Sequence, residues 1–327
     1  MLQPDNTQAD ECVSNENLLL EYSYGKIWCA PAMIVVDLVR KKYEKSCEKE
    51  VRTMCPYSIL ALLVTGCVVG FASGLLGVGG SFIMVPVQYW IYTGMGIDAD
   101  IAIKMAFGTN MFVVLPTALS GFYVHRKRGA VWWKAALFLG SCGLVGAAAG
   151  STIASHIPGN ILKITFGSVI LAGGIRMLTA RPPRIDAEPQ ENRLVWILCG
   201  LPLGLITGFV GIGGGVVMIP AMTLLMKFNM HRAVGTSTAV MMLTSIGGLI
   251  GYIINGWTVE GIPSPHLGYL YIWSGLALAV TSVFMAQVGA RAAHLLPAIK
   301  LKRIFIVILF YMGLKMLGFF EWLNLTI

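Results

Sequence analysis

The stretch GFASGLLGVGGSFIMVP, which runs from Gly70 to Pro86, has a second copy in GLITGFVGIGGGVVMIP, from Gly204 to Pro220. Both copies lie in long apolar stretches, and no charged residue occurs from position 57 to 97 or from 194 to 226. Proteins built from two related halves within a membrane carry such duplicated, glycine-broken segments, with irregular backbone near mid-membrane. The repeated motif therefore predicts a membrane protein of two repeated halves, each with a glycine-broken or re-entrant helix.

The composition also indicates a membrane protein. Hydrophobic residues make up 56% of the 327-residue chain and charged residues only 12%, and the mean hydropathy is +0.72. A typical soluble domain has about 25% charged residues, whereas a helix that crosses the ~30 Å hydrocarbon core needs about 20 apolar residues. We expect an all-α, polytopic integral protein of the cell membrane (inner or plasma membrane), multi-pass and surrounded by the lipid bilayer.

Ten apolar segments are visible, five on each side of a linker rich in proline and charge. They cover residues 57–77, 81–94, 105–124, 135–154 and 161–179, then 194–212, 215–226, 233–255, 268–290 and 301–320. Two further blocks match between the halves: AFGT at 106–109 with AVGT at 233–236, and 158–178 with 297–317. We predict an N-terminal extension (1–56, partly soluble or interfacial), a first transmembrane repeat (57–180), a linker loop (181–193) and a second transmembrane repeat (194–327).

An odd number of segments in each half would turn the second half upside down relative to the first. The net charge of +8 comes from basic residues in short loops such as 125–134 and 291–303, which the positive-inside rule places in the cytoplasm. This pattern does not indicate nucleic-acid binding, and it favours an inverted repeat. Segments 81–94 and 215–226 reach only ~20 Å at about 1.5 Å per residue, so we expect half-helices or re-entrant hairpins there.

The glycines around the repeated motif have two uses. At 66–74 and at 200–208 they recur at every fourth position, the spacing that lets membrane helices approach closely. The following runs lack this period, and glycine there permits left-handed backbone and close approach of a ligand. Because each run opens a half-helix, its free N–H groups and positive dipole end favour an anion; a purely structural turn is the alternative. The expected anion contacts are Gly77, Gly79, Gly80, Ser81, Gly211, Gly213, Gly214 and Gly215.

Neutral and cationic side chains could assist. Thr109 and Asn110 in the first half, and Thr236 and Ser237 in the second, could donate hydrogen bonds to an anion, although Ser and Thr commonly bond back to their own helix. Lys104 and Arg232 stand at the mouths of the third segments, where they could steer an anion or merely anchor a loop.

Several classes of site are not indicated. No Asp or Glu lies in the middle of an apolar segment, although cation antiporters and proton pumps commonly need one. The seven cysteines show no metal-binding spacing, so we expect no metal site. The chain also has no nucleotide-binding motif and no nucleophile–base constellation. We therefore expect no catalytic residues, no cofactor and no enzymatic activity.

The paired motif G-x-x-x-G-x-x-G-h-G-G-[GS]-h-h-h-h-P resembles that of the sulfite exporter TauE/SafE family of membrane permeases. AFGTN at 106–110, PTALSG at 116–121 and the tail from His125 to Trp132 are also similar. The resemblance covers residues 57–320 and implies a permease for small anions such as sulfite, sulfonates or related oxyanions. It also implies that the two glycine runs form facing anion sites near mid-membrane. Asn110 departs from the serine expected there, and residues 1–56 have no counterpart in the family core.

The leading hypothesis is a secondary transporter, a permease or exporter of a small anionic substrate such as sulfite, an organosulfonate or a related oxyanion. With no nucleotide-binding motif, a gradient of ions or of substrate would supply the energy. An anion channel that uses the same half-helix sites is the alternative. The sequence leaves the particular anion, the direction, the coupling ion and the oligomeric state open.

Overall fold

A computed structural model describes residues 56–76, 79–179, 193–224, 226–228, 230–292 and 298–319. The predicted N-terminal extension and linker loop lie outside these residues, apart from Pro56 and Arg193, as does Gly77. The predicted division of the chain into four regions therefore stays a prediction.

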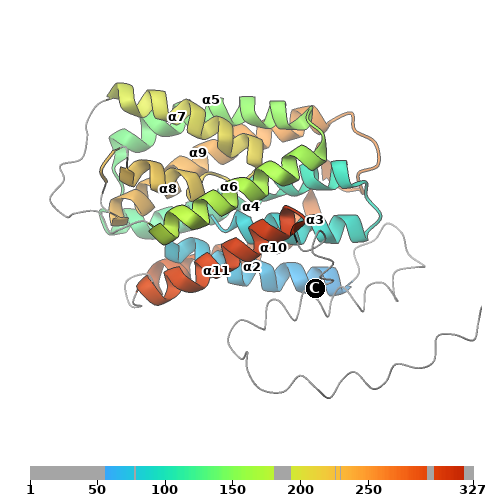
Figure 1. Cartoon of the computed structure of the whole chain (residues 1–327), viewed down its shortest axis with the longest axis horizontal. Helices are drawn as coiled ribbons and strands as arrows, with labels where there is room; N and C mark the ends of the chain where they lie inside the picture. The colour runs from blue at the N-terminus through green and yellow to red at the C-terminus, as the bar shows by residue number, and fades with distance from the viewer. Residues whose placement is uncertain are drawn as a thin grey trace, which may run out of the picture.

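The described residues form a bundle of long helices that lie roughly side by side (Figure 1). The helices are α2 (Pro56–Leu76), α3 (Ser81–Gly94), α4 (Ala99–Lys127), α5 (Trp133–Ser155), α6 (Gly159–Thr179), α7 (Arg193–Val210), α8 (Gly215–Leu224), α9 (Met230–Gly256), α10 (Ile272–Ala292) and α11 (Ala298–Met316). Each coincides with one predicted apolar segment, so the helical, polytopic fold is confirmed. One difference is a short antiparallel hairpin, β1 (His266–Leu267) and β2 (Leu270–Tyr271), which the helical prediction for 268–290 missed.

Four of the helices, α4, α5, α9 and α10, are long and apolar enough to cross a membrane. Helices α2 and α7 contain shorter apolar stretches, Ser58–Gly74 and Leu194–Val210. Large apolar side chains such as Leu137, Ile254 and Phe284 are exposed on the outside of the bundle, as expected for a surface that faces lipid.

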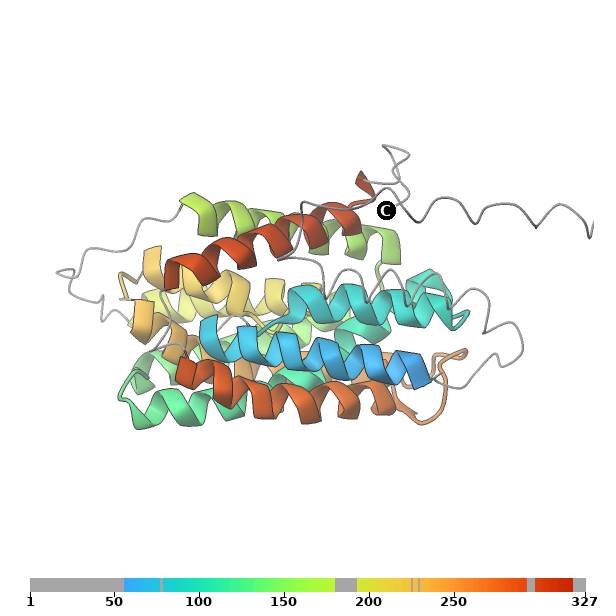
Figure 2. The ribbon, with the colours of Figure 1, turned by 90° about the horizontal axis from the view of Figure 1, so that it is seen from below.

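Two pairs of helices pack closely in parallel, α2 with α10 and α5 with α7, through the glycines spaced four apart. A Cβ on Gly70 would lie 2.4 Å from the Ser282 carbonyl oxygen, and one on Gly204 would lie 2.2 Å from the Gly143 carbonyl oxygen. Only glycine allows this approach, so the predicted packing role of these glycines is confirmed. Figure 2 shows α2 and α10, in blue and orange, lying along each other.

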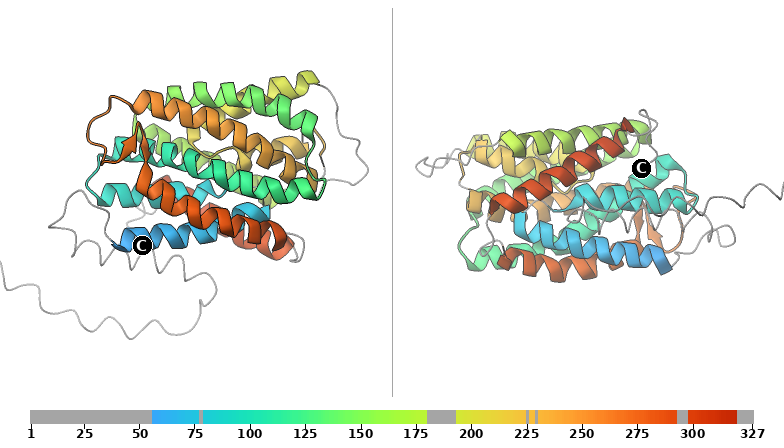
Figure 3. Two further views of the ribbon diagram at one scale, coloured as in Figure 1. Left: turned by 180° about the vertical axis from the view of Figure 1, so that it is seen from behind. Right: turned by 60° about the horizontal axis from the view of Figure 1, so that its bottom comes forward.

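Corresponding helices of the two halves meet in opposite directions. In the pair formed by α4 and α9, Gly248 lies against Met111 while Gly121 faces Thr238, so residue numbers rise along one helix as they fall along the other. These two helices lie next to each other through the centre of the bundle (Figure 3, left).

The pair formed by α6 and α11 is antiparallel in the same way. Gly167 lies beside Leu317, whereas Gly174, two turns later, lies beside Leu309. Figure 3 (right) shows α11, in red, running diagonally across α6, in green. Both pairs place a helix of the first half against its counterpart in the second half.

Helix α3 turns back along α2. Gly80, at its start, lies against Val69, about two turns before the end of α2. Near the other end of α3, the Tyr92 hydroxyl is 2.5 Å from the Ser274 hydroxyl in the first turn of α10. Because α10 and α2 run in parallel, α3 returns to the end of the bundle at which α2 begins.

Helix α8 turns back along α7 in a similar manner, toward the opposite end of the bundle. Its first turn lies beside Thr207, which faces Gly214. Just after its last turn, Phe228 stacks on Trp132 with ring centroids 5.3 Å apart, and Trp132 also contacts Trp196 in the first turn of α7. The two expected half-helices are thus present, and each forms a hairpin with the helix before it.

Candidate functional site

The glycine runs between the hairpin helices are left-handed backbone. Gly79 and Gly80 have φ of 81° and 66°, and Gly80 directly precedes the first residue of α3. In the second run φ is 67° at Gly211, 74° at Gly213 and 104° at Gly214. Residues with a Cβ are strained in this region. The runs are therefore glycine-rich because the chain must reverse direction and start a new helix within a few residues.

The two runs meet inside the bundle, although they come from different halves. The buried Ser81 hydroxyl, at the start of α3, donates a 2.6 Å hydrogen bond to the carbonyl of Ile212. A Cβ on Gly79 would lie 3.7 Å from the same carbonyl oxygen. The structure thus brings together the predicted site residues of both runs that it describes.

Two neighbouring carbonyl groups of the second run each accept a hydrogen bond from a buried side chain. Asn110 Nδ2 donates to Gly211 (2.5 Å) and Ser81 Oγ donates to Ile212 (2.6 Å). The Thr244 hydroxyl lies 3.3 Å from the next carbonyl, that of Gly213, and 3.2 Å from two carbonyls of its own helix. The Asn110 and Ser81 donors hold the carbonyl side of this backbone against α4 and α3.

The starts of both half-helices offer amide groups. In α3 the amides of Ile83 and Met84 donate to the Gly80 carbonyl, and in α8 the amides of Val217 and Met218 donate to that of Gly214. The amides of Ser81 in α3 and of Gly215 and Val216 in α8 precede these hydrogen bonds, so they have no partner within the helix. The positive ends of two helix dipoles therefore lie at one place in the bundle, which favours a negative ligand.

Apolar side chains lie against both runs. Met241 of α9 lies against Gly79: a Cβ added to Gly79 would be 2.5 Å from Met241 Cε. Val114 of α4 lies against Gly213 in the same way: a Cβ added to Gly213 would be 2.6 Å from Val114 Cγ1. Val114 and Met241 belong, with Ala118, to a small buried cluster apart from the main core. In the register that aligns the AFGT and AVGT motifs, they are equivalent positions of the two halves.

Thr109 and Thr236 occupy equivalent positions and make equivalent contacts. The Thr109 hydroxyl accepts a hydrogen bond of 3.0 Å from the amide of Tyr271, just before α10, and that of Thr236 accepts one of 3.1 Å from the amide of Trp132, just before α5. Ser237, the neighbour of Thr236, donates to the Val234 carbonyl of its own helix. Each threonine thus ties its helix to a loop of the other half, and its role as an anion donor stays a prediction.

The glycine before each threonine explains the rest of the repeated motif. A Cβ on Gly108 would lie 3.0 Å from the carbonyl oxygen of Tyr269, and one on Gly235 would lie 2.6 Å from that of Ala130. In both cases the missing side chain lets the loop of the other half approach the helix. The AFGT and AVGT blocks are therefore docking points between the halves.

Two buried amide side chains have polar atoms without a hydrogen-bond partner among the described residues, and the sequence prediction included only one of these residues. Asn110 is fully buried, and its Oδ1 has no hydrogen-bond partner. Gln88 in α3 is also fully buried, and neither its Nε2 nor its Oε1 has a partner. The signal for Gln88 was present, since it is the single amide side chain in the apolar stretch 81–94.

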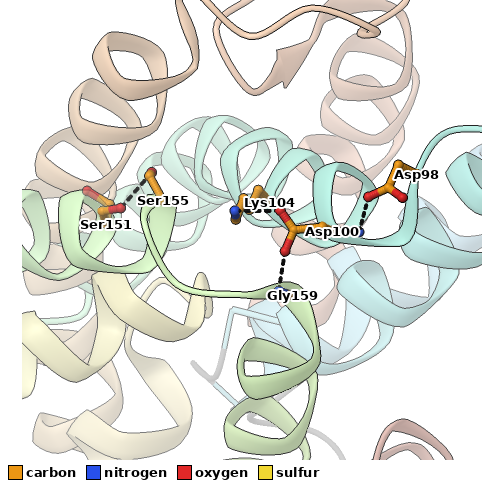
Figure 4. A network of polar contacts seen from close by, with 6 residues as sticks. All are labelled: Asp98, Asp100, Lys104, Ser151, Ser155 and Gly159. Carbon is orange, nitrogen blue, oxygen red and sulfur yellow. Dashed lines mark hydrogen bonds and ion pairs between the residues drawn. The ribbon is translucent and has the colours of Figure 1, made fainter.

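Lys104 is engaged by an acidic neighbour. Its Nζ is 2.7 Å from Asp100 Oδ2, and the Lys104 residue is 6% exposed. Asp100 also accepts a hydrogen bond from the amide of Gly159 at the start of α6, while Asp98 caps α4 by accepting from the Asp100 amide (Figure 4). Burial and the Asp100 charge together raise the pKa of the nearby Tyr269 hydroxyl. Steering by Lys104 stays a prediction, but its charge is largely offset here.

Arg232 lies at the other end of the bundle. Its guanidinium carbon is 5.5 Å from the ring centroid of Trp132, and the residue is exposed. This contact anchors the loop before α5, and it leaves the side chain near water, where it could still attract an anion. Within the described part of the chain, no group of three or more His, Cys, Asp or Glu side chains could hold a metal ion.

Broken helices that meet inside a bundle with helices able to cross a bilayer are typical of polytopic membrane transport proteins. The comparison with known families agrees: the chain belongs to the sulfite exporter TauE/SafE family, whose family model matches residues 62–316. This membership confirms the family resemblance of the glycine motifs, and the protein is a multi-pass protein of the cell membrane.

Several relatives are named membrane transporters. The chain is 34% identical over 259 residues to a "Probable membrane transporter protein" of Methanocaldococcus jannaschii, covering 78% of this chain and 94% of the relative. It is 26% identical over 258 residues to one of Haemophilus influenzae, with 79% and 97% covered. A relative in Bacillus subtilis is 27% identical over 282 residues, with 80% and 97% covered. No solved structure matches the chain.

Proposed function

We propose that this protein is a secondary permease that carries a small anion, such as sulfite, an organosulfonate or a related oxyanion, across the cell membrane. The observation that carries the proposal is the bonding of the second glycine run. Its carbonyls at Gly211 and Ile212 accept hydrogen bonds from Asn110 and Ser81, whereas the amides of Ser81, Gly215 and Val216 precede the intrahelical hydrogen bonds and can face a ligand. Amides and helix N-termini bind anions. The family description, sulfite exporter, supports the substrate class.

We also propose that the two halves are inverted repeats that alternate access to the site. In support, α4 packs antiparallel to its counterpart α9, and α6 to its counterpart α11. The hairpins α2–α3 and α7–α8 open toward opposite ends of the bundle. The hydrogen bonds of Thr109 and Thr236 to the loops before α10 and α5 are reciprocal, as a pseudo-two-fold axis would require. An axis in the membrane plane relates such halves in many carriers.

A carrier is favoured over an anion channel by the packing of Met241 and Val114. These side chains lie directly against Gly79 and Gly213, and we propose that they move aside before an anion reaches the neighbouring amides. Met has three rotatable side-chain bonds and repacks easily. A site that opens only when the halves rearrange is the feature of alternating access, whereas a channel needs a continuous path.

Reconstitution into liposomes tests the proposal. Sulfite uptake is measured with and without unlabelled sulfite inside, and empty liposomes provide the control. The proposal predicts saturable uptake that internal sulfite accelerates; uptake that is neither saturable nor accelerated would favour the channel. Folded protein that moves no sulfite, sulfonate or carboxylate would contradict a permease for anions. The relatives are named transporters, and we propose no catalytic role.

A further inference from the structure

The unpartnered polar atoms of two buried amide side chains, Asn110 and Gln88, narrow down the chemical form of the cargo. Asn110 Oδ1 and both polar atoms of Gln88 are buried without a hydrogen-bond partner among the described residues. Burying an unpaired polar atom destabilises a fold, so native proteins keep such atoms rarely. At a binding site the missing partner is often the ligand itself.

Asn110 places one of these atoms beside the second run. Its Nδ2 donates to the Gly211 carbonyl at 2.5 Å. Because Oδ1 is bonded to the same carbon as Nδ2, it lies within a few ångströms of that run. The contact with a carbonyl also assigns the amide, since only the NH₂ group donates. Asn110 therefore presents an acceptor, which repels a fully deprotonated anion.

Gln88 presents a donor and an acceptor from the first half-helix. It follows Ser81 by seven residues and precedes Tyr92 by four, a spacing that puts the three on one side of α3. Ser81 contacts Ile212 in the second run, and Tyr92 donates to Thr109, the neighbour of Asn110. This side of α3 thus faces the runs and α4.

An anion that carries no hydrogen would satisfy the amide donors but leave the two free acceptors facing negative charge. We propose that the cargo binds as a singly protonated oxyanion. Its deprotonated oxygens accept from the amides of Ser81, Gly215 and Val216 and from Gln88 Nε2, and its O–H group donates to Asn110 Oδ1 or Gln88 Oε1. This inference rests on the proposed function and narrows its cargo to oxyanions that keep an O–H group, such as hydrogensulfite, in preference to organosulfonates.

In this proposal, only the first half of the protein supplies the side chains that recognise the proton of the cargo. In the register of the repeats, the positions of Asn110 and Gln88 are occupied in the second half by Ser237 and Met222. Met222 is fully buried, and the Ser237 hydroxyl donates to Val234 of its own helix. The two halves are therefore related in fold but unequal in their contacts with the cargo.

The titratable groups that face the site do not provide a simple alternative source of pH dependence. Tyrosine and lysine titrate well above neutral pH, and the Lys104 charge is paired with Asp100. His125, also on α4, is 15 residues beyond Asn110, about 22 Å along the helix. From the elements packed against α4, the described titratable and charged groups are Cys67 on α2, Tyr89 and Tyr92 on α3, Lys163 and Arg176 on α6, Arg232 and Tyr252 on α9, Tyr271 on β2 and Arg291 on α10.

The test uses the full chain in liposomes. Sulfite uptake is measured across a pH series that spans the second ionisation of sulfite, with methanesulfonate, a monoanion without an O–H group, as competitor. The apparent affinity for total sulfite should fall about tenfold per pH unit above that ionisation, because only the protonated fraction binds. Methanesulfonate should compete at least about tenfold less well than sulfite at acidic pH, since it leaves the buried acceptors unpaired.

Gln88→Met, which copies Met222, is the matched variant. It should reduce the discrimination between sulfite and methanesulfonate by about fivefold or more while melting at the same or a higher temperature, since an unpaired amide is removed. Asn110→Ser, which copies Ser237, repeats the test if Gln88→Met fails to fold. A pH-independent affinity, or equal competition by methanesulfonate in the wild type, would overturn the inference and leave the permease standing. Absence of sulfite uptake at every pH would overturn both.

Discussion

Ser81 provides a direct test of how the two halves meet, because its hydroxyl joins the first half-helix to the second glycine run. Ser81→Ala removes the donor that lies 2.6 Å from the Ile212 carbonyl and leaves the helix backbone intact. Both groups are buried, so water does not replace the lost hydrogen bond. We expect the carbonyl to be left unpaired or to turn toward the space that the anion would occupy.

The size of the effect follows from that geometry. A buried acceptor that loses its donor costs about 1–3 kcal/mol. At about 1.4 kcal/mol per tenfold, the same loss expressed in binding weakens the affinity for sulfite by roughly 5- to 150-fold. The melting temperature should fall by about 2–4 °C for each kcal/mol of destabilisation.

The assay compares the thermal stability in detergent and the KM for sulfite uptake of Ser81→Ala with those of the wild type. Thr165→Ala is the matched control, because Thr165 is only partly buried and its hydroxyl donates to the Ile161 carbonyl of its own helix. Its effect should stay within about 0.5 kcal/mol. A Ser81→Ala protein with wild-type stability and wild-type KM would refute the reasoning that this bond holds the second run.

Other substitutions test the turn and the end of α4. Gly80→Ala should sharply reduce the yield of folded protein, because the φ of Gly80 is 66° and the new Cβ would lie 2.0 Å from Val69 Cγ1. Gly96→Ala is the control: Gly96 has a φ of 77° but open space around it, so this variant shows the backbone strain alone, about 1–2 kcal/mol. Equal melting temperatures for the two variants would contradict the close approach of Gly80 to Val69. Asp100→Asn should lower the melting temperature more than Lys104→Met, since Asp100 both pairs with Lys104 and accepts a hydrogen bond from the Gly159 amide at the start of α6. A larger decrease for Lys104→Met than for Asp100→Asn would contradict this network. Lys104→Met should change the KM for sulfite by no more than about fivefold, because its charge is already paired, and a larger increase would show that it steers the anion.

The helices were predictable because apolar length and glycine breaks are local signals. The start of α4 was less predictable. Helix α4 begins at Ala99, earlier than the predicted 105, because Asp98 caps it and Asp100 pairs with Lys104 one turn later. These polar residues resemble a loop when only hydropathy is considered. The hairpin at 266–271 has no alternating pattern that would have indicated strands.

The candidate site was only partly predictable. The glycine runs were recognised from their composition, but the bonds that join them, Ser81 to Ile212 and Asn110 to Gly211, link residues more than 100 positions apart. A single sequence carries no signal for such pairs. Thr109 and Thr236 were expected to face an anion, yet their hydroxyls accept amides of the opposite half, a role that depends on how the halves dock.

The most direct test of the central claim is to locate a bound anion in crystals of the protein. Selenite resembles sulfite in shape and charge, and its selenium gives an anomalous X-ray signal. The account predicts a selenium peak between the two glycine runs, within hydrogen-bond reach of the amides that begin α3 and α8. Selenite bound only elsewhere in the bundle, with none at these amides, would contradict it.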